Sequence, residues 1–127
     1  MVITDESQFK HLENCVTIEG SLTFMSFTYS NFSCPNLLVI KQGLIIHRVD
    51  NLLSIIQLLP NLAYIYGIPV ALNITENKDF EKLDFKKLMI YSGGHVVVKG
   101  NPRLCLSDFR IWLKIQNIQP PDEFLQV

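Results

Sequence analysis

Apolar residues recur along the chain in a fixed order, which predicts a stack of similar units. In each unit, two apolar positions three residues apart are followed by a glycine, which comes one residue later in the second unit. The first position advances by 22, 25 and 26 residues from one unit to the next. The first positions are Cys15, Leu37, Leu62 and Leu88, the second positions are Ile18, Ile40, Ile65 and Tyr91, and the glycines are Gly20, Gly43, Gly67 and Gly93.

A short run of alternating apolar and polar residues follows each glycine. Alternation with a period of two indicates a β-strand with one buried face, and the β-branched residues in these runs favour strands. Glycine suits a sharp turn before each run because it adopts positive φ at little cost. The predicted inward positions are Leu22, Phe24, Leu44, Ile46, Val70, Leu72, Ile74, Val96 and Val98.

One such unit is too small to bury its own apolar face. Four units stacked with paired strands about 4.8 Å apart would place like residues over like and close a continuous core. Repeats of about 20–29 residues built on leucine and isoleucine rows fall in the leucine-rich-repeat range. The chain has 127 residues, 48% of them apolar, which is enough for one such domain. We therefore predict a mainly β fold of stacked leucine-rich-like repeats with short helices.

Two helices are predicted outside the strands. Residues 52–59 place their apolar side chains on one stripe, and Pro60 ends this helix. A second helix begins at Ser107, a suitable N-cap, and ends before Pro120. We expect it to cover the open end of the stack with an apolar face formed by Ile111, Trp112 and Ile115.

Charge and hydropathy exclude several classes of function. The chain has 11 Lys+Arg and 12 Asp+Glu without a basic stripe, so no nucleic-acid partner is expected. Residues 51–75 carry no formal charge, but Pro60, Gly67 and Pro69 interrupt them. Polar side chains in this stretch would also lie unpaired in lipid, so we predict no membrane span. No signal peptide is visible, because the first eleven residues lack a basic region followed by an apolar one.

The common signatures of catalysis and metal binding are missing from the sequence. It contains no G-x-S-x-G, G-x-G-x-x-G, P-loop or H-E-x-x-H motif. His11, His47 and His95 lie far apart and lack the spacing of metal ligands. We therefore expect no enzyme activity, no cofactor and no metal site.

Several segments resemble one family of receptor domains. The segments NCVTIEGSLTF, NLAYIYG, ALNIT and SGGHVVVKGNPRLC, followed by a helix that contains Trp112, are similar to the receptor L domain. The most specific part is GNPRLC with Trp112 seven residues after Cys105, followed by the opening NC-x-x-I-x-G. The resemblance covers residues 9–116, and we expect residues 1–8 and 117–127 to be flexible ends.

Receptor L domains build the ligand-binding ectodomains of the insulin and epidermal growth factor receptors, and occur in divergent nematode proteins. The resemblance implies a right-handed parallel β-helix of stacked leucine-rich-like repeats, capped by a C-terminal helix. It also implies a non-catalytic extracellular recognition domain, the ectodomain of a membrane protein, whose partner is a protein or peptide ligand or another receptor-like chain. The alternative is a structural or intracellular repeat scaffold without hormone binding.

The outward strand positions are the candidate contacts for such a partner. Repeat stacks present broad, rigid surfaces, and an exposed apolar stripe often marks an interaction site. A second interpretation is that another domain of the same protein covers this stripe. The predicted partner-binding residues are Ile45, Ala71 and Val97 in the stripe, with Thr23, His47 and Lys99 beside it.

Three cysteines leave at least one thiol outside any internal disulfide. Cys34 lies three residues before Leu37, which stacks over Cys15 in the repeat register, so a Cys15–Cys34 disulfide is within range. Cys105 would then be unpaired or bonded outside this chain. The alternative is three reduced, buried cysteines in a cytosolic chain. In the family, the cysteines equivalent to Cys15 and Cys105 usually pair outside the stretch present here.

Two sequons are candidate glycosylation sites, Asn31-Phe32-Ser33 and Asn73-Ile74-Thr75. In a secreted chain both would be exposed acceptors. Alternation along the predicted strand points Asn73 opposite to Leu72, and therefore outward. A glycan on Asn73 would block that patch of the sheet from a partner.

Overall fold

A computed structural model describes residues 1–85, 88, 90–92, 94–120 and 122–126. For residues 90–92 and 122, only the backbone is described. The predicted turn glycine Gly93 lies outside the described residues, and so does the side chain of Tyr91.

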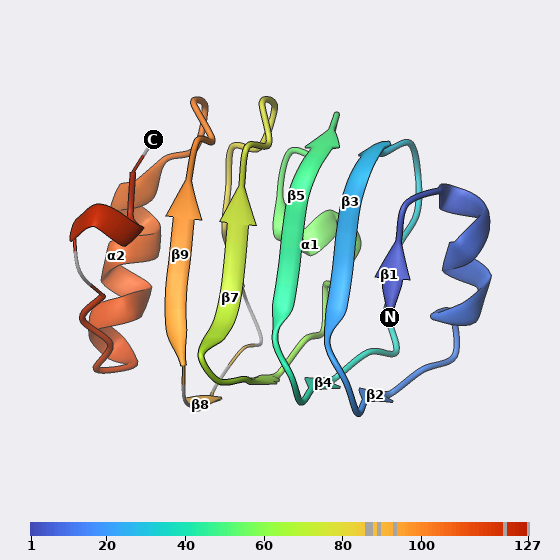
Figure 1. Cartoon of the computed structure of the whole chain (residues 1–127), viewed down its shortest axis with the longest axis horizontal. Helices are drawn as coiled ribbons and strands as arrows, with labels where there is room; N and C mark the ends of the chain where they lie inside the picture. The colour runs from blue at the N-terminus through green and yellow to red at the C-terminus, as the bar shows by residue number, and fades with distance from the viewer. Residues whose placement is uncertain (86–87, 89, 93, 121, 127) are drawn as a thin grey trace.

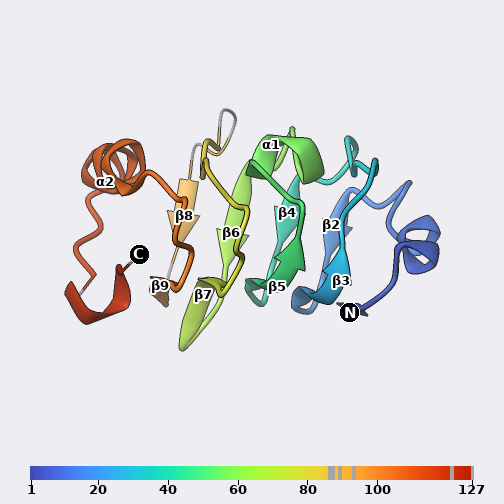
Figure 2. The same ribbon diagram turned by 90° about the horizontal axis from the view of Figure 1, so that it is seen from above.

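The chain forms two parallel β-sheets, which appear as two layers when the molecule is viewed from above (Figure 2). We call the front layer in Figure 1 sheet A and the layer behind it sheet B. The strand order is β1-β3-β5-β7-β9 in sheet A and β2-β4-β6-β8 in sheet B. Sheet A comprises β1 (Val2–Ile3), β3 (Leu22–Thr28), β5 (Leu44–Asp50), β7 (Val70–Thr75) and β9 (His95–Lys99), and sheet B comprises β2 (Thr17–Ile18), β4 (Val39–Ile40), β6 (Tyr64–Tyr66) and β8 (Ile90–Ser92).

From β2 onward, consecutive strands alternate between the two sheets. Each turn of the chain therefore contributes one strand to sheet B and one to sheet A. The apolar positions before each glycine form sheet B, and the alternating run after it forms sheet A. This arrangement confirms the predicted mainly β fold of stacked units with parallel strands.

The repeat rows lie in register inside the molecule, as predicted. In sheet B, Ile18 pairs with Ile40, and Ile40 pairs with Ile65. All three side chains are buried. In the first row, Leu37, Leu62 and Leu88 are buried, and Cys15 packs partly against the same core. The inward rows of sheet A are Leu22, Leu44, Leu72 and Val96, and then Phe24, Ile46, Ile74 and Val98, each at most 1% exposed. Val70, which was also predicted to face inward, is only partly buried.

Close backbone packing explains the glycines at the start of the sheet A strands. Gly43 and Gly94 have φ of +100° and +71°, a region that favours glycine. A Cβ on Gly94 would collide with the carbonyl oxygen of Gly67. A Cβ on Gly67 would lie 2.9 Å from the backbone nitrogen of Gly43. Gly20 differs, because a Cβ there would meet nothing within 4 Å.

Two buried asparagines join successive turns beyond the other end of the sheet A strands. Asn77 and Asn101 are both 0% exposed. The Oδ1 of Asn101 accepts hydrogen bonds from the backbone nitrogen and from Nδ2 of Asn77, each at 3.0 Å. The Oδ1 of Asn77 accepts from the backbone nitrogen of Val49 at 2.9 Å. The Nδ2 of Asn101 donates to the carbonyl oxygen of Ile74 at 2.9 Å. Buried amides bonded in this way fix adjacent turns relative to one another.

Short helices flank the coil (Figure 1). The 3-10 helix η1 (Glu6–His11) lies at the N-terminal end, and α1 (Ile55–Leu58) lies between β5 and β6. α1 is shorter than the predicted helix over 52–59. Its start is fixed by Gln57, whose Oε1 accepts from the backbone nitrogens of Leu53 at 2.9 Å and Ser54 at 3.1 Å.

Helix α2 (Leu106–Ile115) covers the C-terminal end of the stack, but through a different face from the predicted one. Phe109 and Leu113 are 1% and 3% exposed, whereas Ile111 and Ile115 are 58% and 75% exposed. The Trp112 ring stacks on Phe109 with centroids 5.4 Å apart. The predicted face was therefore wrong for both isoleucines, because Phe109 and Leu113, four residues apart, fill the end of the core.

Both ends of the chain carry regular structure where flexible ends were expected. Val2–Ile3 pairs with β3, and Ile3 is 1% exposed. At the other end, η2 (Asp122–Phe124) precedes Leu125, which forms a parallel bridge to Val98 and is 5% exposed. Ile3 and Leu125 hold the two ends in place because each fills apolar space at one end of sheet A.

Candidate functional site

The outward side of sheet A carries two rows of side chains aligned by the strand register. Neighbouring strands are parallel, so residues at matching positions lie side by side across the sheet. We call these two rows the sheet A face. The first row consists of Val2, Thr23, Ile45, Asn73 and Val97, and the second row of Met25, His47, Thr75 and Lys99.

Five of the six predicted contact residues lie on the sheet A face. These residues differ in exposure. Thr23 is only 9% exposed, because it lies between Val2 of β1 and Ile45 of β5. Ile45 and Val97 are partly exposed. The five residues are Thr23, Ile45, His47, Val97 and Lys99.

The prediction that Ala71 belongs to this face was wrong, since Ala71 is 0% exposed. The register between β7 and β9 shifts from the pair Val70–His95 to the pair Leu72–Val96. Ala71 is the extra residue at this irregularity, and its Cα lies 3.1 Å from where a Cβ on Gly67 would be. It therefore packs among the turn glycines, and Asn73 occupies the place in the row expected for Ala71.

Sequence reasoning missed Met25 and Thr75 as members of the face. Met25 pairs with His47, and His47 pairs with Thr75. Both missed residues lie two positions beyond a first-row residue on the same strand. Simple alternation along each strand was therefore a sufficient signal.

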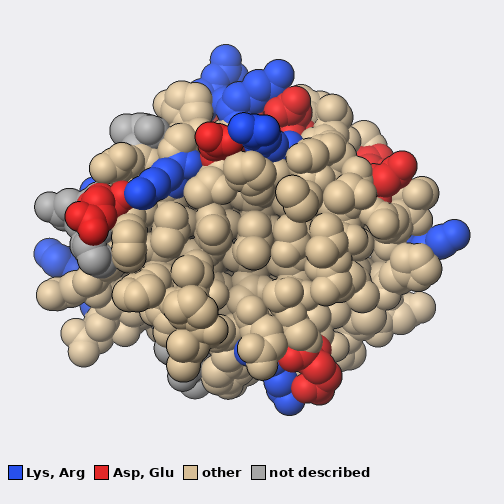
Figure 3. Space-filling view, viewed as in Figure 1, with Lys and Arg blue, Asp and Glu red and all other residues tan. Residues whose placement is uncertain are grey.

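The centre of the sheet A face carries no Lys, Arg, Asp or Glu, as Figure 3 shows. Charged side chains gather mainly along the edge where the sheet A strands end. There the Nε of Arg48 lies 2.8 Å from Oε2 of Glu76. The Nζ of Lys78 lies 3.6 Å from Oδ2 of Asp50. These charges pair with one another at the rim and leave an apolar and weakly polar surface between them.

His47 connects the face to this charged rim. Its Nδ1 lies 2.8 Å from Oγ1 of Thr75, and its Nε2 lies 3.7 Å from Oε2 of Glu76. The side chain is 29% exposed. Contacts at both ring nitrogens hold the imidazole in one orientation, so a partner would meet a preset group.

The two sequon asparagines have different surroundings. Asn31 is exposed in the connection between β3 and β4. Asn73 lies in the middle of the sheet A face, between Ile45 and Val97. Its Oδ1 is buried and has no hydrogen-bond partner among the described residues. A glycan on Asn31 would lie away from the two rows, whereas one on Asn73 would cover them.

All three cysteines are free thiols in this structure, so the predicted Cys15–Cys34 disulfide is not formed in it. The Sγ of Cys15 donates to the carbonyl oxygen of His11 at 3.3 Å. Burial, with a smaller contribution from the nearby Cys15, raises the pKa of Cys34 to about 12. Cys105 is exposed. Its hydrogen bond with the Ser107 side chain, 3.1 Å between Sγ and Oγ, lowers the pKa of Cys105.

The part of the chain that the structure describes contains neither a candidate metal site nor a helix that could cross a membrane. No three His, Cys, Asp or Glu side chains come together there in a way that could hold a metal ion. Among the same residues, no helix combines the length and apolar content needed to cross a membrane.

The architecture and its face define a class of protein. Two parallel sheets wound from one repeat and capped by a helix present a broad face whose centre carries no charged side chain, as in repeat proteins with extended, rigid surfaces. The family model of the receptor L domain matches residues 14–116. The chain belongs to the receptor L domain family. Receptor L domains are non-catalytic ligand-binding domains.

Curated relatives are receptors for insulin-like peptides. The chain is 35% identical over 117 residues to the insulin-like peptide receptor of Branchiostoma lanceolatum, which covers 84% of this chain and 8% of that protein. It is 34% identical over 111 residues to the insulin-like growth factor 1 receptor of Xenopus laevis, covering 80% and 8%. It is 34% identical over 116 residues to the insulin-like receptor of Drosophila melanogaster, covering 86% and 5%. The chain spans less than a tenth of the length of these three relatives.

Proposed function

We propose that this chain is the recognition domain of an insulin-type receptor or receptor-like protein and binds a peptide of the insulin family through the sheet A face. Membership of the receptor L domain family supports ligand binding. The names of the relatives support an insulin-like peptide as the ligand. The observation that carries the proposal is the partly apolar surface formed by the two aligned rows, whose centre carries no charged side chain.

The physical argument rests on the composition of the face. Ile45 and Val97 expose apolar surface on either side of the Asn73 amide. A partner that covers them gains the free energy of apolar burial, about 25 cal/mol per Å². The paired charges at the rim match the usual anatomy of an interface, in which a less polar centre is surrounded by a polar border. The sheet backbone already fixes the positions of the two rows, so little conformational freedom is lost when a partner binds.

The proposal includes an extracellular location, as part of the ectodomain of a membrane protein. In that oxidising setting, Cys15 and Cys34 would form a disulfide, and Cys105 would pair outside this chain. The influence of Cys15 on the pKa of Cys34 supports their proximity. Both sequon asparagines stay candidate acceptors, but a glycan on Asn73 and a peptide on the sheet A face exclude each other. We therefore infer that Asn31 carries the glycan in the form that binds.

We also infer that residues 9–116 form a right-handed β-helix, to which Val2–Ile3 and Leu125 add a strand and a bridge at the two ends of sheet A. About 98% of connections between parallel strands of one sheet are right-handed, because of the twist of the strands. The alternation of strands between sheets A and B supports a continuous coil of this kind.

Calorimetric titration of the full chain with insulin and with insulin-like growth factor 1 tests the proposal. The double variant Ile45→Glu with Val97→Glu places two carboxylates in the first row, and the matched control Val39→Glu with Tyr64→Glu places two on sheet B. We expect the wild type and the control to bind at least one hormone. The sheet A variant should lose at least about tenfold in affinity while its melting temperature stays close to that of the control. Equal binding by both double variants, or no binding by the wild type, would contradict the proposal.

The second candidate function is a structural or intracellular repeat scaffold, in which the three cysteines would stay reduced. Expression behind a secretory leader, followed by mass measurement, separates the two candidates. A glycan and the loss of two free thiols support the receptor domain, and the absence of both supports the scaffold.

A further inference from the structure

Residues after helix α2 add one more rung to sheet A beyond β9. Leu125 forms a parallel bridge with Val98, and the backbone nitrogen of Gln126 donates to the carbonyl oxygen of Val98 at 2.8 Å. Leu125 is 5% exposed, so it continues the inward row. By the same register, Phe124 lies next to Val97 and extends the first row of the sheet A face.

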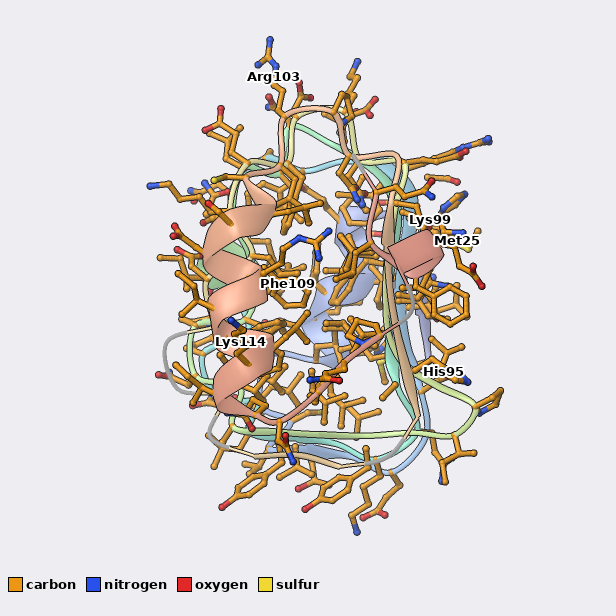
Figure 4. All side chains as sticks on the ribbon, turned by 90° about the vertical axis from the view of Figure 1, so that its left-hand side faces the viewer. Met25, His95, Lys99, Arg103, Phe109 and Lys114 are labelled. Carbon is orange, nitrogen blue, oxygen red and sulfur yellow. The ribbon has the colours of Figure 1, made fainter. Side chains whose placement is uncertain are left out.

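Two contacts hold the Phe124 ring at this position. Its centroid lies 5.4 Å from that of His95, with an angle of 78° between the rings. The Nζ of Lys99 lies 5.7 Å from the centroid of Phe124. Edge-to-face and cation–π contacts of this kind favour one ring placement. Figure 4 shows Lys99 and His95 on the same side of the molecule as Met25, with η2 beside Lys99 and α2 on the other side.

This end of the face combines apolar surface with positive charge. The Phe124 ring and the Val97 side chain are both partly exposed. Lys99 has no carboxylate within ion-pair distance in the described ranges of the chain, where four ion pairs are formed by other residues. His95 is exposed beside the ring. Neither outward row contains a Phe, Tyr or Trp, so Phe124 brings an aromatic ring to a face that otherwise lacks one.

We propose that Phe124, Val97, His95 and Lys99 form a specificity-determining subsite, which accepts an apolar side chain next to a carboxylate of a peptide partner. This inference rests on the proposed function and names the part of the peptide that the C-terminal end of the face binds. A preset aromatic ring is a common binding hot spot. The Lys99 ammonium can supply a charge-assisted hydrogen bond to the carboxylate.

Selection from a phage library of random dodecapeptides tests the subsite without assuming a particular hormone. The library is panned on the full chain, and the selected peptides are synthesised and titrated against variants. We expect sequences enriched in an apolar residue next to Asp or Glu. Phe124→Ala should weaken binding by at least about tenfold, as for a hot-spot aromatic. Lys99→Gln should weaken it less and reduce its dependence on salt. Tyr66→Ala, which removes a 37% exposed ring from sheet B, should leave affinity unchanged.

A further variant separates loss of the ring from release of the C-terminal rung. Phe124→Leu keeps an apolar side chain over β9, and the protease resistance of residues 122–126 reports whether the rung stays docked. A docked Phe124→Leu variant with weakened binding supports the subsite. Peptides that lose binding to the Ile45→Glu, Val97→Glu variant but bind Phe124→Ala at full strength overturn the subsite and leave the proposed function intact. Failure to select any peptide contradicts both.

Discussion

Gly94 shows how single residues allow the turns of the chain to stack. Its φ of +71° lies in the left-handed region, and a side chain there would strike the backbone of Gly67. The backbone nitrogen of Ala71 lies 2.9 Å from the same hypothetical Cβ. The obstacle is backbone rather than a flexible side chain, so it cannot move aside without changing the distance between turns.

Gly94→Ala should therefore lower the free energy of unfolding by about 2–4 kcal/mol, from positive-φ strain and overpacking together. Gly20→Ala is the matched control, because its Cβ meets nothing within 4 Å and should change stability by less than about 0.5 kcal/mol. Urea denaturation followed by circular dichroism measures both. Equal stability of the two variants would show that the turns are not packed as described.

Cys105 and Cys34 should differ strongly in reactivity when the thiols are reduced. The Ser107 hydrogen bond lowers the pKa of Cys105, so its thiolate forms at lower pH than that of an ordinary cysteine. Burial raises the pKa of Cys34 to about 12, so it stays protonated in the folded chain near neutral pH. Iodoacetamide should label Cys105 first and Cys34 only on unfolding.

The rate of Cys105 alkylation should rise with pH as the thiolate forms, and Ser107→Ala should move the midpoint of this rise to higher pH. Peptide mass spectrometry over a series of pH values measures the midpoint. An unchanged midpoint in Ser107→Ala would contradict the hydrogen bond, and rapid labelling of native Cys34 would contradict its burial.

At the scale of elements, strands were more predictable than helices and irregularities. The inward rows that begin with Leu22 and Phe24 could be predicted, because alternation with a period of two indicates which side chains face inward. The extra residue at Ala71 could not, because it depends on how β7 meets β9 and on the glycines packed beneath it. The buried face of α2 could not be predicted either, because the helix has two apolar stripes. The shape of the core end decides that Phe109 is buried and Ile111 is exposed.

This choice of stripe on α2 gives a prediction for the helix as an element. Phe109→Ala should lower the free energy of unfolding by about 3–5 kcal/mol, because it leaves a cavity at the end of the core. Ile115→Ala should change it by less than about 0.5 kcal/mol, because that side chain is 75% exposed. Thermal unfolding of both variants is the measurement. A larger loss of stability for Ile115→Ala than for Phe109→Ala would contradict the structure and support the buried face predicted from sequence.

At the scale of the whole molecule, the repeat pattern was sufficient to predict a stack of parallel strands but not its two ends. Ile3 and Leu125 lie outside the repeats, and only the finished core shows that each has apolar space to fill. The site was predictable to a similar extent. The outward positions of Ile45 and Val97 follow from alternation along their strands. The position of Phe124 depends on the bridge between Leu125 and Val98, which lies outside the repeat pattern.

The hydrogen-bonded pair of buried asparagines, Asn77 and Asn101, which we call the asparagine ladder, is a second whole-molecule feature that sequence reasoning missed. Asn77 and Asn101 each follow a sheet A strand by two residues, which was an available signal. Their hydrogen bonds link three successive turns through Ile46, Ile74 and Lys99 carbonyl oxygens. The ladder makes the stack rigid at the edge where the charged rim lies, and so fixes the border of the sheet A face.

The central claim is that a peptide of the insulin family binds the sheet A face. Methyl-labelled NMR spectra of the full chain, recorded during titration with insulin, test it most directly because they report on individual side chains. The methyl signals of Val2, Ile45 and Val97 should shift, while those of Val39 on sheet B and Ile111 on α2 stay in place. Shifts confined to Val39 or Ile111, or no shift at saturating insulin, would contradict the claim.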